Sequence, residues 1–242
     1  MPRAEPFPKG PAGAGRDIKK KEAKRMSIAE NIARVRADIA AAAKEAGRKP
    51  EEITLVGASK MNGAPACREA IAAGIDALGE NRVQEMTAKL AEHAYDGAPL
   101  HFIGHLQRNK VRQVAGKVSL IQSVGSLELL EEIEKTAGKL EIVQDILLEV
   151  NIGREEAKSG FLPERLLPGA EAALEKSHVR VLGLMTIPPA EADREENLRY
   201  FDKVRALFLD MEEKLFHNGL QVLSMGMSGD YEDAVRAGAT MV

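Results

Sequence analysis

The chain has 242 residues, of which 44% are hydrophobic and 29% are charged, and its formal net charge is −3. This composition is typical of a soluble globular protein with one large domain. The single cysteine, Cys67, excludes an intramolecular disulfide and a cysteine-based zinc site. No stretch approaches the roughly 18 consecutive apolar residues that span a membrane, so we expect a cytoplasmic protein that does not bind membranes.

The first 25 residues differ from the rest of the chain. They carry eight Lys or Arg and only three Asp or Glu, together with several prolines and glycines, and they lack the apolar segment of a signal peptide. This pattern predicts a disordered basic extension over residues 1–25 and a folded domain over residues 26–242. Because the remainder is acidic, the sequence argues against a nucleic-acid surface, which needs clustered positive charge.

The domain opens with a strong helix signal. Ser27 and Glu30 form a capping-box pattern, apolar residues recur at helical spacing after them, and Gly47 follows. We expect a leading helix over residues 27–46.

From residue 53 onward, short runs rich in Val, Ile and Leu alternate with amphipathic segments of roughly helical length, which indicates parallel strands with crossover helices. An open doubly wound sheet would carry a glycine-rich turn after its first strand, and residues 58–62 lack one. We therefore predict a TIM-type (β/α)8 barrel. No helix follows the eighth run, so the leading helix takes that place in the outer ring. The eight runs are residues 53–58, 76–79, 100–104, 118–123, 145–151, 180–185, 221–226 and 239–242.

Polar residues gather at the carboxyl ends of these runs, where barrel active sites lie. Lys60 follows the first run and is the candidate nucleophile. A lysine in a partly dry barrel mouth loses ammonium solvation and shifts toward the neutral amine that attacks aldehydes. A lysine at this position can also simply extend into solvent.

The segment 224–230 joins the seventh run to a helix start through small residues. Such a turn lets backbone N–H groups and a serine hydroxyl approach a phosphate, although it can equally be a plain turn with Ser228 or Asp230 as helix cap. His105 and Asn81 fit a positioning role. Lys158 is a second amine near the mouth, and the five histidines have no metal-ligand spacing; we predict no metal site.

Five segments resemble one known family. They are LVGASK at 55–60, LGENRVQE at 78–85, HFIGHLQRNK at 101–110, GLMTI at 183–187 and LSMGMSGD at 223–230. Their sequence and order resemble the pyridoxal-phosphate homeostasis proteins, also called proline synthase co-transcribed proteins, from about Met26 to Val242.

The resemblance implies a barrel like the N-terminal domain of alanine racemase, with pyridoxal 5'-phosphate held as a Schiff base on Lys60. It also implies that Ser228 and Gly229 belong to the phosphate cup and that Asn81, His105 and Met225 line the pocket. Members of the family hold, buffer or supply the cofactor, so we expect PLP-dependent apo-enzymes as partners. We further expect a monomer without catalytic activity of its own.

One departure from the family concerns the eighth strand, which normally continues through an Arg-Ile-Gly-Thr segment. Here the chain stops at Met241 and Val242. We therefore expect a truncated eighth strand, destabilised barrel closure and weaker cofactor retention than in an intact relative. Equal cofactor affinity for this chain and for one extended by the segment would contradict that expectation.

The sequence is compatible with three other functions. An amino-acid racemase would need an acid/base group opposite the lysine, and the chain offers only Tyr95, Tyr200 and Tyr231. A Schiff-base lyase would act directly on a carbonyl substrate. An inert barrel would follow from the truncation.

Overall fold

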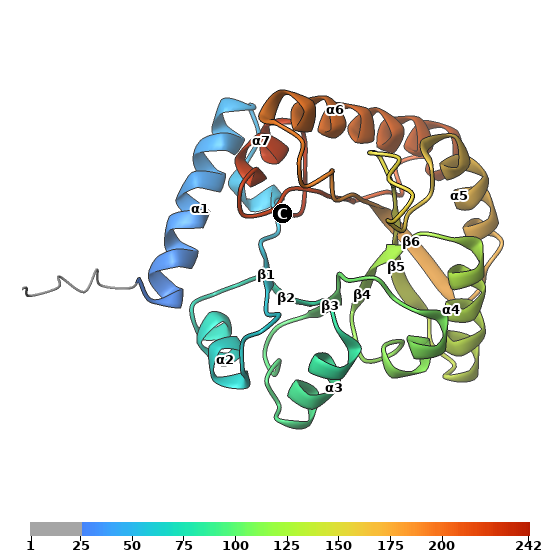
Figure 1. The fold of residues 1–242 in the computed structure, drawn as a ribbon, viewed down its shortest axis with the longest axis horizontal. Helices are drawn as coiled ribbons and strands as arrows, with labels where there is room; N and C mark the ends of the chain where they lie inside the picture. Colours follow the sequence, from blue (N-terminus) through green and yellow to red (C-terminus); the bar gives the residue numbers. More distant parts are fainter. Residues whose placement is uncertain (1–25) are drawn as a thin grey trace, which may run out of the picture.

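The computed structural model describes residues 26–242, so the predicted basic extension lies outside the described residues. Within this range the chain forms a curled, all-parallel sheet with helices on its outside (Figure 1). The strands pair in chain order from β1 to β7, as a TIM-type barrel requires. No helix of the described residues is long and apolar enough to cross a membrane.

Each of the first seven predicted runs overlaps a strand, and four of the strands extend one residue beyond the predicted run. The strands are β1 (Val56–Ala58), β2 (Ala77–Glu80), β3 (Leu100–Phe102), β4 (Leu120–Val124), β5 (Gln144–Glu149), β6 (Val179–Met185) and β7 (Val222–Ser224). The α-helices are α1 (Ile28–Glu45), α2 (Ala64–Ala72), α3 (Val83–Ala91), α4 (Leu127–Lys139), α5 (Leu166–Leu174), α6 (Arg194–Met211) and α7 (Tyr231–Arg236). A 3-10 helix, η2 (Arg108–Gln113), connects β3 to β4.

The eighth predicted run closes the barrel through single bridges instead of a full strand. Met241 forms parallel bridges with Thr54, just before β1, and with Ser224 at the end of β7. Backbone hydrogen bonds of 2.8–3.0 Å join residues 240 and 242 to Thr54 and Val56. The Met241 N–H donates to the carbonyl of Leu223. The described chain therefore ends between its first and seventh strands (Figure 1).

Helix α1 confirms the leading helix and the capping box that were predicted from the sequence. The Ser27 hydroxyl accepts from the Glu30 N–H at 3.1 Å, and the Glu30 carboxylate accepts from the Ser27 N–H at 2.8 Å, which completes the capping box. In the ring of helices, α1 lies between α7 and α2 and contacts both (Figure 1). It thus occupies the place of the helix that would follow an eighth strand.

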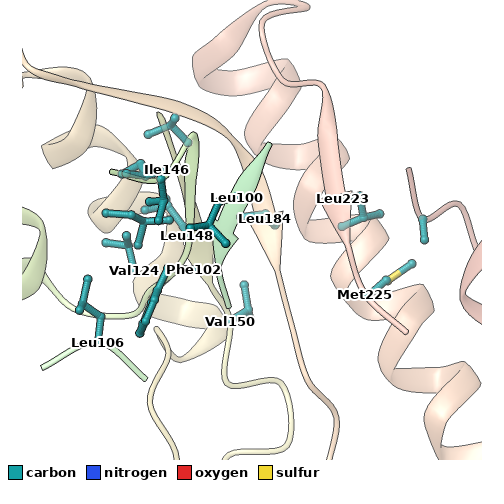
Figure 2. Packing of buried hydrophobic residues seen from close by; sticks show 14 of the residues in the cluster. Leu100, Phe102, Leu106, Val124, Ile146, Leu148, Val150, Leu184, Leu223 and Met225 are labelled. Carbon is teal, nitrogen blue, oxygen red and sulfur yellow. The ribbon is translucent and has the colours of Figure 1, made fainter. Parts of the chain in front are cut away.

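The hydrophobic core has two parts, because successive side chains of each strand point alternately toward the outer helices and toward the barrel interior. Figure 2 shows residues of the larger part, including Ile146 and Leu148 of β5, which are fully buried. Each such side chain contributes roughly 1.5–3 kcal/mol by leaving water. The smaller part fills the barrel interior and consists of Leu120, Leu147, Met185 and Met241, with Val56, Leu182 and Val222 against it.

Candidate functional site

Strand β1 has one face toward the helices and one toward the barrel interior. A Cβ on Gly57 would meet Ile75 and Leu78 on the helix side, whereas Val56 packs against the interior cluster. Ala58 shares the inner face of Val56 but is exposed to solvent. The barrel is therefore open at the level of Ala58, at the carboxyl end of the sheet.

Lys60 follows Ala58 at this opening. The sheet hydrogen bonding continues one residue beyond β1, because the Ser59 N–H donates to the carbonyl of Gly79 at 2.9 Å. The next residue on the inner face is Lys60, whose side chain is exposed. The lysine was expected in a partly dry barrel mouth, whereas in this structure Lys60 is exposed to solvent. Within residues 26–242, no carboxylate forms an ion pair with Lys60.

Asn81 takes the corresponding position after β2. Its Oδ1 atom is buried and finds no hydrogen-bond partner within residues 26–242. The backbone of Asn81 packs directly on Gly104, where a Cβ would lie 2.3 Å from the Asn81 carbonyl oxygen. Only glycine fits there without displacing the loop after β2. A buried acceptor without a donor costs free energy unless a ligand supplies one.

Several other polar residues at the strand ends are occupied with the scaffold. Ser123 donates to the carbonyl of Gly104 at 2.6 Å, and Thr186 donates to the carbonyl of Val150 at 2.8 Å. The Asn151 side chain donates to the carbonyl of Glu155 and accepts from its N–H, which shapes the loop after β5. These residues hold loops in place, whereas Lys60 and the Asn81 side-chain oxygen remain available.

A buried polar network crosses the barrel interior from β3 to the chain end. The Gln122 side chain bonds to His101 Nδ1 at 3.0 Å, accepts from the Ser224 hydroxyl at 2.8 Å and donates to Met241 Sδ at 3.2 Å. Burial lowers the pKa of His101 to about 4, so its imidazole is neutral at pH 7. The network links β7 and the closing segment to the middle of the sheet.

Glu149 is a residue of the mouth that sequence reasoning missed. It ends β5 two residues after Leu147, a member of the interior cluster, so strand alternation directs it inward. Burial raises the pKa of Glu149, and the hydrogen bond from Ser159 and the nearby Lys158 ammonium partly oppose that rise. Its carboxylate accepts from the Ser159 hydroxyl at 3.0 Å. Counting alternate positions along the fifth run would have found it.

Lys158 is held near this carboxylate by other groups. Its ammonium pairs with Glu155 at 2.6 Å and donates to the carbonyl of Pro188 at 3.3 Å. The second amine considered from the sequence is therefore engaged, in contrast to Lys60.

The predicted phosphate residues lie on the other side of the mouth. Ser228 and Gly229 are exposed in the turn before α7, and a Cβ on Gly229 would meet nothing within 4 Å. They line a cavity of about 540 Å³ with other residues of this turn and with Arg194 and Asn197 of α6. Lys60, Asn81, His105 and Met225 do not line this cavity.

His105 and Met225 differ in their surroundings. His105 is exposed on the loop after β3. Met225 is only 2% exposed and packs in the larger core (Figure 2), while its N–H donates to the carbonyl of Met241 at 3.2 Å. In this structure Met225 has a packing role, and a pocket-lining role stays a prediction.

Comparison with known proteins identifies the relatives of this chain. The model of the alanine racemase N-terminal domain matches residues 28–242. A pyridoxal phosphate homeostasis protein of Aquifex aeolicus is 44% identical over 217 residues, which cover 90% of this chain and 95% of that protein. The pyridoxal phosphate homeostasis protein of Escherichia coli is 38% identical, and the match covers 89% of this chain and 92% of that protein.

Solved structures agree with the sequence comparison. PipY of Synechococcus elongatus with PLP bound superposes with a TM-score of 0.77 at 32% identity, covering 89% of this chain and 96% of that one. An alanine racemase of Clostridium difficile shares the fold, with a TM-score of 0.66 at 17% identity over 86% of this chain and 54% of its own. The chain therefore belongs to the pyridoxal phosphate homeostasis protein family, whose barrel is of the alanine racemase N-terminal type.

Proposed function

We propose that this protein binds pyridoxal 5'-phosphate covalently through Lys60 and buffers the cofactor or supplies it to PLP-dependent apo-enzymes. The names of the relatives and the PLP-bound PipY structure support the choice of cofactor. The residues at the barrel mouth support the way in which it would be held.

One observation carries the proposal. Lys60 is the next inward-facing residue after Ala58 at the open end of the barrel, and it forms no ion pair within residues 26–242. The cofactor, when bound, supplies an aldehyde that reacts with amines. Condensation joins the Lys60 nitrogen to the aldehyde carbon and releases water, and the exposed side chain leaves the amine accessible for this reaction.

Four further residues would hold the rest of the cofactor. The exposed Ser228 hydroxyl and the backbone N–H of Gly229 are donors suited to a phosphate. The buried Asn81 Oδ1 atom is an acceptor that lacks a donor within the described chain. His105 stands exposed at the rim and can cover the ring. These roles need only binding groups, and no proton-transfer residue is required.

The tyrosines argue against the racemase alternative. Tyr95 is buried and donates to Glu80 at 2.9 Å, and burial raises its pKa far above the ordinary value. Tyr231 donates to Asp38 at 2.8 Å, and burial raises its pKa to about 12. Tyr200 lies on the outer helix α6. None of the three stands at the mouth as a free acid or base.

A comparison of the unaltered chain with Lys60→Arg tests the proposal. Arginine keeps the positive charge that attracts the phosphate but does not form the covalent bond. We expect the unaltered chain to retain PLP through gel filtration, with visible absorbance, and to restore activity to an added PLP-dependent apo-enzyme. Lys60→Arg should lose the cofactor during filtration. Equal retention by the two proteins would contradict covalent holding on Lys60.

A further inference from the structure

The peptide that carries Lys60 is anchored by a buried charged cluster made of Ser59, Glu80, Lys89 and Tyr95, here called the Glu80 cluster. Glu80 is fully buried, and its Oε1 atom accepts from Ser59 Oγ at 2.5 Å, from Lys89 Nζ at 2.5 Å and from Tyr95 at 2.9 Å. Lys89 Nζ also donates to the carbonyl of Ser59 at 2.7 Å. Ser59 is thus held through both its side chain and its backbone.

The turn after Lys60 is held by α3 and by a hydrogen bond within the turn. The Met61 N–H donates to Glu85 Oε2 at 3.0 Å, and that carboxylate lies 4.0 Å from Lys89 Nζ. Met61 has a φ of 62°, a left-handed conformation that non-glycine residues seldom adopt. The side-chain amide of Asn62 donates to the Lys60 carbonyl at 3.1 Å. A sharp turn directly after Lys60 is therefore fixed on a neighbouring unit, β2 and α3.

Stability alone does not account for this arrangement. Lys89 is 7% exposed and Glu80 is 0% exposed, so both charges have lost their hydration. Apolar residues of similar volume are often as stabilising as a buried ion pair, whereas an ion pair fixes a particular geometry through directional bonds. The geometry fixed here is that of the segment 59–62, because the cluster bonds directly to Ser59 on one side of Lys60.

We infer that Glu80 and Lys89 are positioning residues for Lys60: through Ser59 they set the place of the reactive amine at the barrel mouth. The inference rests on the proposed function. It predicts that loss of the Lys89 bond to the Ser59 carbonyl slows covalent capture of PLP even when the fold is kept.

The test compares Lys89→Met, Lys89→Arg and the double variant Glu80→Leu with Lys89→Met. The proteins are mixed with PLP, reduced with borohydride and digested, and the pyridoxyl group on Lys60 is followed over time by mass spectrometry. Circular dichroism and thermal unfolding report the fold. Because the lost bonds involve charged groups, we expect capture to be about tenfold slower or more in Lys89→Met.

The other variants separate positioning from folding. The double variant removes both charges and should recover thermal stability while capture stays slow, and Lys89→Arg, which keeps the charge and donors, should recover most of the rate. Asp145→Asn breaks the Asp145–Arg180 pair at the opposite end of the barrel and serves as the control, with unchanged capture. Capture at the normal rate in the folded double variant would overturn the inference. No label on Lys60 in the unaltered chain would instead overturn the proposed function.

Discussion

The two sides of the barrel mouth are built differently. On the side of β1 and β2, the backbone around Lys60 is tied to the buried Glu80 cluster. On the side of β7 and α7, Ser228 and Gly229 are exposed in an open turn beside a cavity of about 540 Å³. If Lys60 attaches the cofactor and Ser228 and Gly229 bind its phosphate, as we propose, then the backbone at the attachment residue is held firmly while the phosphate groups are accessible to solvent.

The largest expected effect comes from a substitution in the Glu80 cluster, on the side of β1 and β2. Glu80→Leu leaves the buried Lys89 ammonium with only the Glu85 carboxylate, 4.0 Å away, as a counter-charge, and we expect this to cost about 3–5 kcal/mol of unfolding free energy. Urea denaturation of the single variant measures this loss. The double variant with Lys89→Met should recover most of it. A single variant within about 1 kcal/mol of the unaltered chain would show that the cluster is not a buried charged unit.

The next effect concerns the Gln122 network, which links β7 and the closing segment to the middle of the sheet. His101 has a folded-state pKa of about 4, below its ordinary value of 6.5, so the unfolded chain binds a proton first as the pH falls. This group therefore lowers stability as the pH falls from about 6.5 to about 4, by about 3 kcal/mol in total.

Unfolding free energies of the unaltered chain and of His101→Gln, measured across this pH range, isolate the contribution of His101. The difference between the two proteins should change with pH in this window and be constant above it. A pH-independent difference would mean that His101 is not held neutral by burial.

The smallest effect is expected for Ser228, in the exposed turn between β7 and α7. Ser228→Ala removes one hydroxyl that would donate to the phosphate, so PLP affinity should fall about tenfold. Its unfolding free energy should be unchanged because Ser228 is exposed. Ser177→Ala, an exposed serine before β6, is the matched control. Equal PLP affinity in the two variants would remove Ser228 from the phosphate site.

Much of the barrel follows from patterns that a sequence carries locally. Apolar runs predict eight strands, of which seven form, and helical spacing predicts α1, because burial imposes these patterns on the sequence. The capping box of Ser27 and Glu30 is likewise a local signal. Met241 forms its bridges to Thr54 and Ser224 only when the barrel closes. The sequence of the eighth run therefore does not predict that this run pairs through single bridges instead of a full strand.

The site was less predictable for a physical reason. Strand-end residues look alike in sequence, and only the folded chain separates Thr186, bonded to the scaffold, from Lys60. The role of Lys89 depends on a helix that packs beside Ser59, thirty residues away in sequence. Strand alternation in the fifth run could have predicted that Glu149 points inward. It could not have predicted that burial raises the pKa of its carboxyl group.

We propose that Lys60 is the residue that captures the cofactor. Incubation of the 242-residue chain with substoichiometric PLP, followed by borohydride reduction and peptide mapping, tests it directly. We expect the pyridoxyl group on Lys60, and we expect Lys158, which is paired with Glu155, to stay unlabelled. Label on Lys158 or another lysine, with Lys60 unmodified, would contradict it.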